Sequence, residues 1–292
     1  MIPEHIRHKL RTIDSIATLP HIATEILSMM RNNNATMRHI AVVIEQDPSV
    51  TAKILKVANS PLWGYSGRVE NVQRALVMLG LKQVSNIVIA ISLYSTFAKL
   101  KPNPFFDRAK FWLHSVGTAQ VARKFTSQIG LHFHGEEFVA GLLHDLGKMV
   151  LDQFWGDLFQ EIIQEARETS QPIFSVEQKR LGCSHAEIGA YLLQNWNFPS
   201  SIVNVLAYHH TPQLSEGYRD LVGVIHISEI LCELWGVGFD EDLESSSPYD
   251  NPSWQFLRQH SPKLSVFDLE RFVFEMNTEM DNAQLFLNLV NE

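Results

Sequence analysis

Helical periodicity of the apolar residues restricts the fold of this chain more than any other feature. Apolar side chains recur at positions i, i+3 and i+4 in almost every segment, and few stretches alternate in the way that strands require. With 292 residues, 45% of them hydrophobic, the chain can bury one large core or two smaller ones. The sequence therefore predicts an all-α protein.

Two interruptions divide the helical pattern. The run Lys101-Pro102-Asn103-Pro104 ends the first part, and an acidic stretch rich in serine and proline occupies residues 240–252. We predict an amino-terminal helical bundle over residues 1–103 that packs on a second, histidine-rich bundle over residues 104–239. Residues 240–292 are predicted to form an acidic loop and a carboxy-terminal helix that packs back on the body.

The adjacent pair His144-Asp145 is the strongest indication of chemistry. It lies among Leu142, Leu143 and Leu146, so we expect it inside a buried apolar helix. Burying a carboxylate costs several kcal/mol unless a cation or hydrogen bonds compensate. An isolated pair of this kind could equally be a hydrogen bond within the core. Further histidines elsewhere in the chain favour a metal site instead.

Four other segments contribute candidate metal ligands. His114 lies in a helical segment whose small residues allow close packing of a neighbouring helix. His185 follows Ser184, which forms the S-x-x-E capping pattern with Glu187 and so places His185 in a first helical turn. There the helix dipole is expected to keep the imidazole neutral. The remaining candidates are the doublet His209-His210, which ends an apolar helix, and Glu229, which lies within another.

Five imidazoles and two carboxylates on separate helices favour divalent transition metals over calcium, which prefers an all-oxygen shell. Zinc, iron, manganese and nickel are all compatible with this donor set. Lys148 follows the pair on the same helix face, where its ammonium group could meet a phosphate oxygen. The alternative for Lys148 is a solvated lysine near a helix end.

These features together resemble the HD superfamily of metal-dependent phosphohydrolases, and more closely its HDOD branch of bacterial regulatory output modules. The resemblance covers most of the chain. It rests on Leu19-Pro20, residues 44–51, Ala58-Asn59-Ser60-Pro61, residues 75–80, Trp112-Leu113-His114, residues 140–148, Trp196-Asn197-Phe198-Pro199 and His209-His210.

The resemblance implies an HD-type helical bundle that holds one or two divalent metal ions. One ion would be bound by His114, His144, Asp145 and Glu229. Asp145 would bridge to a second ion, bound by His185, His209 and His210. Asp145 and Lys148 would be the catalytic residues of an active enzyme. His132 and His134 have no counterpart in the superfamily pattern and are expected to be loop residues.

The chain departs from the superfamily at three places. Glu229 stands where the superfamily usually has aspartate, and its extra methylene group shifts the carboxylate oxygen. Lys110 stands where some relatives place a glutamate for a third metal. The Gly-Tyr-Pro loop of cyclic di-GMP phosphodiesterases is missing after His209-His210, so cyclic di-GMP is not expected to be a substrate.

Three functions are compatible with this sequence. The favoured one is a signal-transduction module with a metal centre that acts by binding a protein partner or a small phosphate-containing ligand. The second is an active metal-dependent phosphohydrolase on a nucleotide or another phosphate ester, in which Lys148 helps to hold the substrate. The third is a nucleic-acid-binding regulator.

The charge distribution argues against the nucleic-acid function. Residues 1–100 carry 11 basic and 6 acidic side chains, and residues 101–292 carry 13 and 26, but the basic residues are scattered rather than grouped.

The two cysteines form no C-x-x-C pair. The longest apolar stretch, residues 87–93, is too short to span a bilayer. We therefore expect a cytoplasmic protein that does not enter the membrane.

Overall fold

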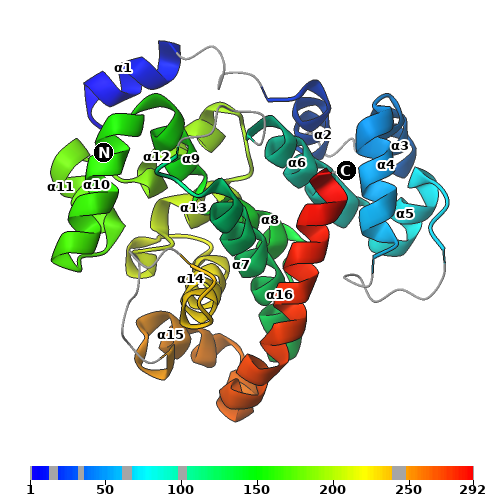
Figure 1. Cartoon of the computed structure of the whole chain (residues 1–292). Coiled ribbons are helices and arrows are strands. Elements are labelled where there is room, and N and C mark those ends of the chain that lie inside the picture. Colours follow the sequence, from blue (N-terminus) through cyan, green and yellow to red (C-terminus); the bar gives the residue numbers. More distant parts are fainter. Residues whose placement is uncertain are drawn as a thin grey trace.

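A computed structural model of the chain describes residues 2–12, 19–31, 36–60, 68–97, 104–238 and 248–291. Within these ranges the protein consists of helices, as the sequence predicts, and has no strand (Figure 1). The α-helices are α1 (Glu4–Thr12), α2 (His21–Arg31), α3 (Met37–Glu45), α4 (Pro48–Ala58), α5 (Val72–Leu79), α6 (Leu81–Phe97), α7 (Arg108–Ile129), α8 (Glu136–Leu143), α9 (Leu146–Phe154), α10 (Gly156–Thr169), α11 (Ile173–Leu181), α12 (His185–Asn195), α13 (Ser200–Tyr208), α14 (Arg219–Leu234), α15 (Pro252–His260) and α16 (Leu269–Asn291). Short 3₁₀ helices cover Pro212–Leu214, Pro248–Asp250 and Pro262–Val266.

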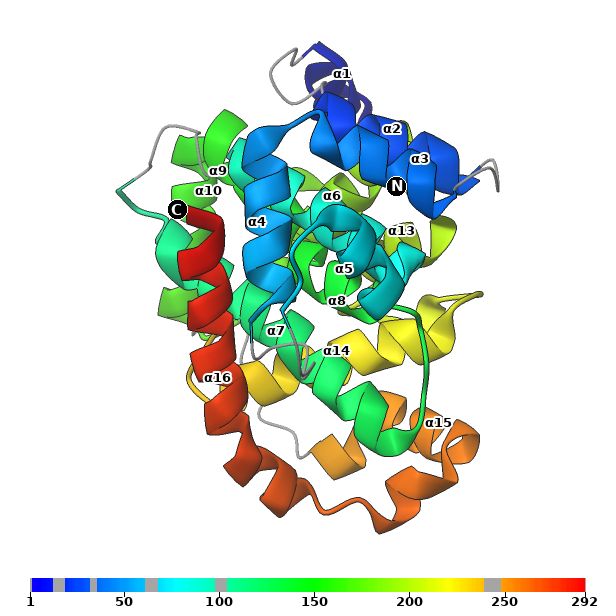
Figure 2. The same ribbon diagram turned by 90° about the vertical axis from the view of Figure 1, so that its right-hand side faces the viewer.

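Helices α2 to α6 form one bundle, and α7 to α15 form a second one around α7, α8 and α14. The carboxy-terminal helix α16 runs along α7 and also contacts α4 and α6, so it packs on both bundles (Figure 2). Helix α1 lies at the opposite end from α3 to α5 (Figure 1) and contacts the second bundle. The Lys9 ammonium group donates to the carbonyl oxygen of Phe154 at 2.6 Å and lies 4.3 Å from the centre of the Trp155 ring.

The division at residues 103 and 239 remains a prediction. Residues 98–103 and 239–247, which include most of the two interruptions, lie outside the described residues.

Local sequence signals explain where several helices begin. Asp47 caps α4 by accepting hydrogen bonds from the backbone N–H groups of Ser49 and Val50, and Pro48 occupies the first helical position. Ser184 and Glu187 form the predicted capping box at the start of α12. That cap places His185 in the first turn, as expected.

The pair His144-Asp145 does not lie inside a continuous helix, which corrects the sequence-based expectation. Helix α8 ends at Leu143 and α9 begins at Leu146, and Asp145 has φ −97° and ψ 9°, outside the helical region. The apolar residues on both sides gave no sign of this break, because each of the two short helices is buried in its own right. The break lets the Asp145 side chain face helices other than its own.

Glycines bring the ligand-bearing helices unusually close together. A Cβ atom on Gly141 of α8 would lie 2.7 Å from the Cα of Ala119 on α7. A Cβ atom on Gly147 of α9 would lie only 1.9 Å from the carbonyl oxygen of His185 at the start of α12. The small residues near His114 thus serve the close packing that the sequence predicts. The second contact places α12 directly against the turn that carries Asp145.

No single described helix is long and apolar enough to cross a membrane. Helices α5 and α6 taken together have the length and apolar composition of a membrane span, although the two helices are bent by 119° relative to each other. Most of α6 is buried against neighbouring helices.

Candidate metal centre

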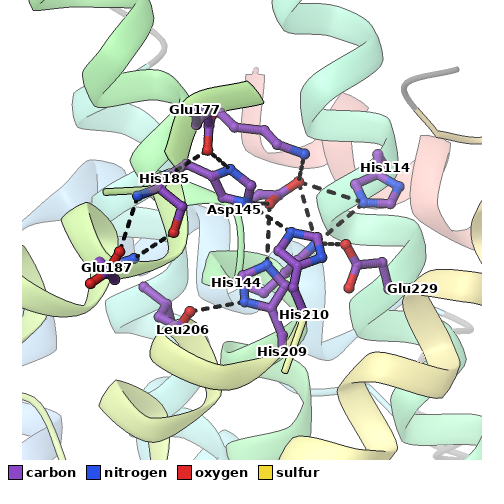
Figure 3. Close-up of polar contacts among 12 residues, drawn as sticks. His114, His144, Asp145, Glu177, His185, Glu187, Leu206, His209, His210 and Glu229 are labelled. Carbon is purple, nitrogen blue, oxygen red and sulfur yellow. Dashed lines mark hydrogen bonds and ion pairs between the residues drawn. The ribbon is translucent and has the colours of Figure 1, made fainter. Parts of the chain in front are cut away.

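Asp145 lies at the centre of a buried cluster of imidazoles from four segments of the chain (Figure 3). Its Oδ1 atom lies 3.1 Å from Nε2 of His185 and 3.6 Å from Nε2 of His209. Its Oδ2 atom lies 3.4 Å from Nε2 of His144 and 3.8 Å from Nε2 of His114. Each carboxylate oxygen therefore faces a different pair of histidines.

The candidate ligands fall into two groups that share Asp145. One consists of Asp145, His185, His209 and His210, and the other of His114, His144, Asp145 and Glu229; within each group the ligand atoms lie within 4.8 Å of one another. These are the two sets that the resemblance implies. Sequence reasoning thus named all seven members of the two groups.

Backbone carbonyl groups orient the first pair of rings. Nδ1 of His144 donates to the carbonyl oxygen of Gly141 at 2.7 Å, and Nδ1 of His114 donates to that of Val237 at 2.8 Å. Because a carbonyl oxygen only accepts, both rings carry their proton on Nδ1 when neutral and present a lone pair on Nε2. Burial lowers the pKa of His144 well below its usual value, so this ring is neutral.

The two Nε2 atoms of that pair lie 3.2 Å apart. Two lone pairs facing each other at this distance repel unless a proton or a cation lies between them. Two nitrogen ligands of a tetrahedral ion with bonds of roughly 2.0–2.1 Å would lie about 3.3–3.4 Å apart. The separation of His114 and His144 therefore fits a shared metal ion.

Glu177 orients the second pair and was missed by sequence reasoning. Its Oε2 atom accepts hydrogen bonds from Nδ1 of His185 at 2.6 Å and from the backbone N–H of His185 at 2.7 Å. The Nε2 atom of His185 lies 3.0 Å from Nε2 of His210. A carboxylate on the outer nitrogen of a histidine is typical of metal ligands, because it fixes the ring and raises its basicity.

The same carboxylate corrects the expected charge of His185. The helix dipole predicts a neutral ring, and burial also lowers its pKa. The Glu177 carboxylate and the hydrogen bonds to Asp145 and Glu177 outweigh both and raise the pKa of His185 to about 9. A metal ion on Nε2 would take the place of the second proton, while Glu177 would still accept from Nδ1.

His209 fits a ligand role by its own hydrogen bonds. Its Nδ1 donates to the carbonyl oxygen of Leu206 at 2.9 Å, and its buried Nε2 has no hydrogen-bond partner among the described residues. Burial lowers the pKa of His209 and lowers that of His210 well below its usual value. Both rings of the doublet are therefore neutral, which is the form in which an imidazole binds a metal ion. A buried nitrogen without a hydrogen-bond partner costs free energy in a protein core. A cation bound to it would remove that cost.

Glu229 and Lys148 complete the centre. Oε1 of Glu229 lies 3.7 Å from Nε2 of His144, so this side chain reaches the cluster. The Lys148 ammonium lies 2.9 Å from Oδ2 of Asp145 and is 1% exposed, which excludes the solvated-lysine alternative. Burial would raise the pKa of Asp145, but Lys148 and the histidines hold it well below its usual value.

The other histidines stay out of the cluster. His132 and His134 lie in the loop before α8, as expected. His226 is buried next to α15, where its Nε2 lies 3.0 Å from Nδ2 of Asn251. The two candidate groups contain none of these three among the residues that the structure describes.

Comparison with known families identifies the chain. The family model of the HDOD domain matches residues 16–212. The chain belongs to the HDOD family. The matched range contains helices α2 to α6 and the cluster around Asp145 except for Glu229.

Solved structures support the HDOD fold over almost the whole length. An HDOD domain protein of unknown function from Geobacter sulfurreducens shares 25% sequence identity with a TM-score of 0.80, covering 95% of this chain and 96% of that one. A candidate signal transduction protein from Marinobacter aquaeolei VT8 shares 23% identity with a TM-score of 0.71, covering 94% of this chain and 59% of that one. The second likeness, at this identity, concerns the fold alone.

One curated relative of this HDOD chain is an uncharacterized protein from Treponema pallidum (strain Nichols). The two are 25% identical over 241 residues, which cover 82% of this chain and 44% of the relative. The chain thus spans less than half the length of this relative.

Proposed function

We propose that this HDOD protein is a signal-transduction module with a buried divalent metal centre that acts through binding of a ligand or a protein partner, not through turnover. The ions would be one or two of iron, zinc, manganese or nickel. The burial of the centre supports this function most strongly. His144, Asp145, His185 and His209 are 0% exposed, and His210 is the one member of the two candidate groups that is partly exposed.

Burial matters because a hydrolase must bring its substrate to the metal. Catalytic sites keep a coordination position open to substrate, whereas structural sites are closed by protein ligands. Here Lys148, which would hold a substrate phosphate, is 1% exposed and hydrogen-bonded to Asp145. Divalent ions in this centre would neutralise the carboxylates and hold α7, α9, α12, α13 and α14 together.

A metal-dependent phosphohydrolase is the second candidate function, and the two groups of candidate ligands support it. His114, Asp145 and His210 belong to these groups, and Lys148 lies beside the shared carboxylate. In that case the ions would supply charge neutralisation for a phosphate ester. Asp145 would hold them, and Lys148 would move from Asp145 to bind the substrate.

A turnover screen separates the two functions. Protein loaded with iron, zinc, manganese or nickel is incubated with p-nitrophenyl phosphate, nucleoside monophosphates and cyclic nucleotides, including cyclic di-GMP, and phosphate or nucleotide release is measured. We expect no turnover above that of the Asp145→Asn variant. Metal-dependent turnover that this substitution abolishes would establish the hydrolase and contradict the regulatory proposal.

A further inference from the structure

A groove of about 510 Å³ lies between α1, α12 and α13, and none of the candidate metal ligands lines it. Its aliphatic lining comes from small or branched side chains, Ile2, Ala190, Val203 and Ala207. Helix α1 forms one wall and is firmly seated, because Ile6 and Leu10 are only 1% and 8% exposed. This wall therefore belongs to the folded body.

Two guanidinium groups from α1 line the groove one helical turn apart. Nε of Arg11 donates to the phenol oxygen of Tyr191 at 3.2 Å, and the exposed Glu4 carboxylate also attracts the Arg11 guanidinium. Arg7 donates to the carbonyl oxygen of Ile2 at 3.2 Å, and its ion pair at 3.4 Å is with Glu4, whose side chain is 74% exposed. Such an exposed pair contributes little and is readily exchanged for a stronger anion.

The one carboxylate that lines the groove, Glu187, does not cancel the two arginines. An oxygen of Glu187 accepts a hydrogen bond from the backbone N–H of Ser184 at 3.2 Å, as part of the capping box of α12. One carboxylate against two guanidinium groups leaves the lining with a net positive charge. Two arginines four residues apart suit a phosphate group, since guanidinium N–H groups form paired, charge-assisted hydrogen bonds with phosphate oxygens.

Aromatic and amide groups complete the lining. Tyr191 and Tyr208 offer rings on which a planar base can stack. Gln194 and Asn204 offer amide groups that can bond the edge of such a base. A bare phosphate or a sugar phosphate would leave these groups unused, whereas a nucleotide would engage both the arginines and the rings.

We propose that this groove binds a nucleotide, with its phosphate on Arg7 and Arg11 and its base against Tyr191 and Tyr208. The ligand would contact the two helices whose ends carry metal ligands, because α12 begins at His185 and Tyr208 directly precedes His209. Nucleotide binding would thus be coupled to the metal centre through α12 and α13. Only this coupling rests on the proposed regulatory function, since nucleotide binding itself needs no metal.

Isothermal titration calorimetry on the full chain tests the proposal. AMP and GMP are compared with adenosine, ribose 5-phosphate and inorganic phosphate. We expect saturable binding of a mononucleotide, at one per chain, that is at least about tenfold tighter than binding of the three partial probes. Arg7→Gln with Arg11→Gln should weaken it by at least about tenfold, because two charge-assisted hydrogen-bonding groups are lost.

Two further variants control for folding and for location. Gln194→Glu adds one negative charge to an exposed position of the groove with nearly the same shape, and it should also weaken binding. Arg271→Gln on α16, outside the groove, removes an equivalent exposed charge and should leave binding unchanged. Unchanged melting temperatures for all of these variants show that folding is intact.

Wild-type protein stripped of metal distinguishes the groove from the metal centre. Nucleotide binding should survive removal of the metal if the groove is the site. The proposal is overturned if no mononucleotide binds, if the arginine variants bind as well as wild type, or if inorganic phosphate binds as tightly. Binding that disappears when the metal is removed would also overturn it and would place the nucleotide at the metals. A chain without metal would refute the proposed function but not the groove.

Discussion

Asp145→Asn is expected to reduce the metal content of the purified protein at least tenfold. The substitution keeps the size of the side chain but removes the negative charge whose two oxygens face the two histidine groups. Metal content is measured by elemental analysis after purification without chelators. A ligand that bridges two groups contributes to both, so neither group should retain its ion.

Chelator sensitivity separates a ligand from a merely structural carboxylate. Removing metal from the wild type should lower its melting temperature by roughly 5–10 °C, since a bound ion stabilises only the folded state. Before any chelator is added, Asp145→Asn should already have a lower melting temperature than the wild type. The reason is that Lys148 loses the carboxylate with which it pairs in the core, at a cost of about 3–5 kcal/mol. Adding a chelator should then change nothing further.

Lys148→Met is the matched control. It breaks the same buried pair from the other side, but it leaves the Asp145 carboxylate in place. This variant should keep its metal even where its stability changes. If Lys148→Met loses metal as completely as Asp145→Asn, or if chelation leaves the wild-type melting temperature unchanged, Asp145 is not a metal ligand.

Gly147→Ala is expected to destabilise the protein by about 3 kcal/mol and to release metal as well. The added methyl group would lie 1.9 Å from the carbonyl oxygen of His185 and 2.6 Å from its carbonyl carbon. Both are backbone atoms, so no side-chain rotation relieves the clash, and α12 must move away from α9. That movement separates His185 from Asp145. The melting temperature should fall by roughly 6–12 °C.

Gly217→Ala tests whether the effect comes from this contact. A Cβ atom on Gly217 would meet nothing within 4 Å. Its stability should therefore stay within about 0.5 kcal/mol of wild type, with full metal content. A Gly147→Ala variant that melts with the wild type would show that α9 and α12 are not held in this close contact.

Sequence reasoning succeeded where a local pattern or a residue type had few possible structural roles. Helical periodicity predicted the all-α fold, and a capping box placed His185 in a first turn. Buried histidines and carboxylates on apolar segments identified the residues that meet around Asp145. Their grouping in space came from the resemblance to the HD superfamily, because segments as far apart as His114 and Glu229 meet only through tertiary packing.

The failures share one physical cause, which is the influence of partners distant in sequence. The break between α8 and α9 is hidden because both sides are apolar. The raised pKa of His185 depends on Glu177, eight residues away on α11. Helical spacing carried a signal for that residue, since Glu177 shares the buried face of α11 with Ile173, Val176 and Leu181.

Elemental analysis of the wild-type chain tests the central claim most directly. The protein is purified without chelators, analysed for iron, zinc, manganese and nickel, then stripped and reloaded with each. Two complete sets of ligands that share Asp145 predict one or two transition-metal ions per chain, restored after stripping. Substoichiometric metal that none of the four ions restores would contradict the metal centre.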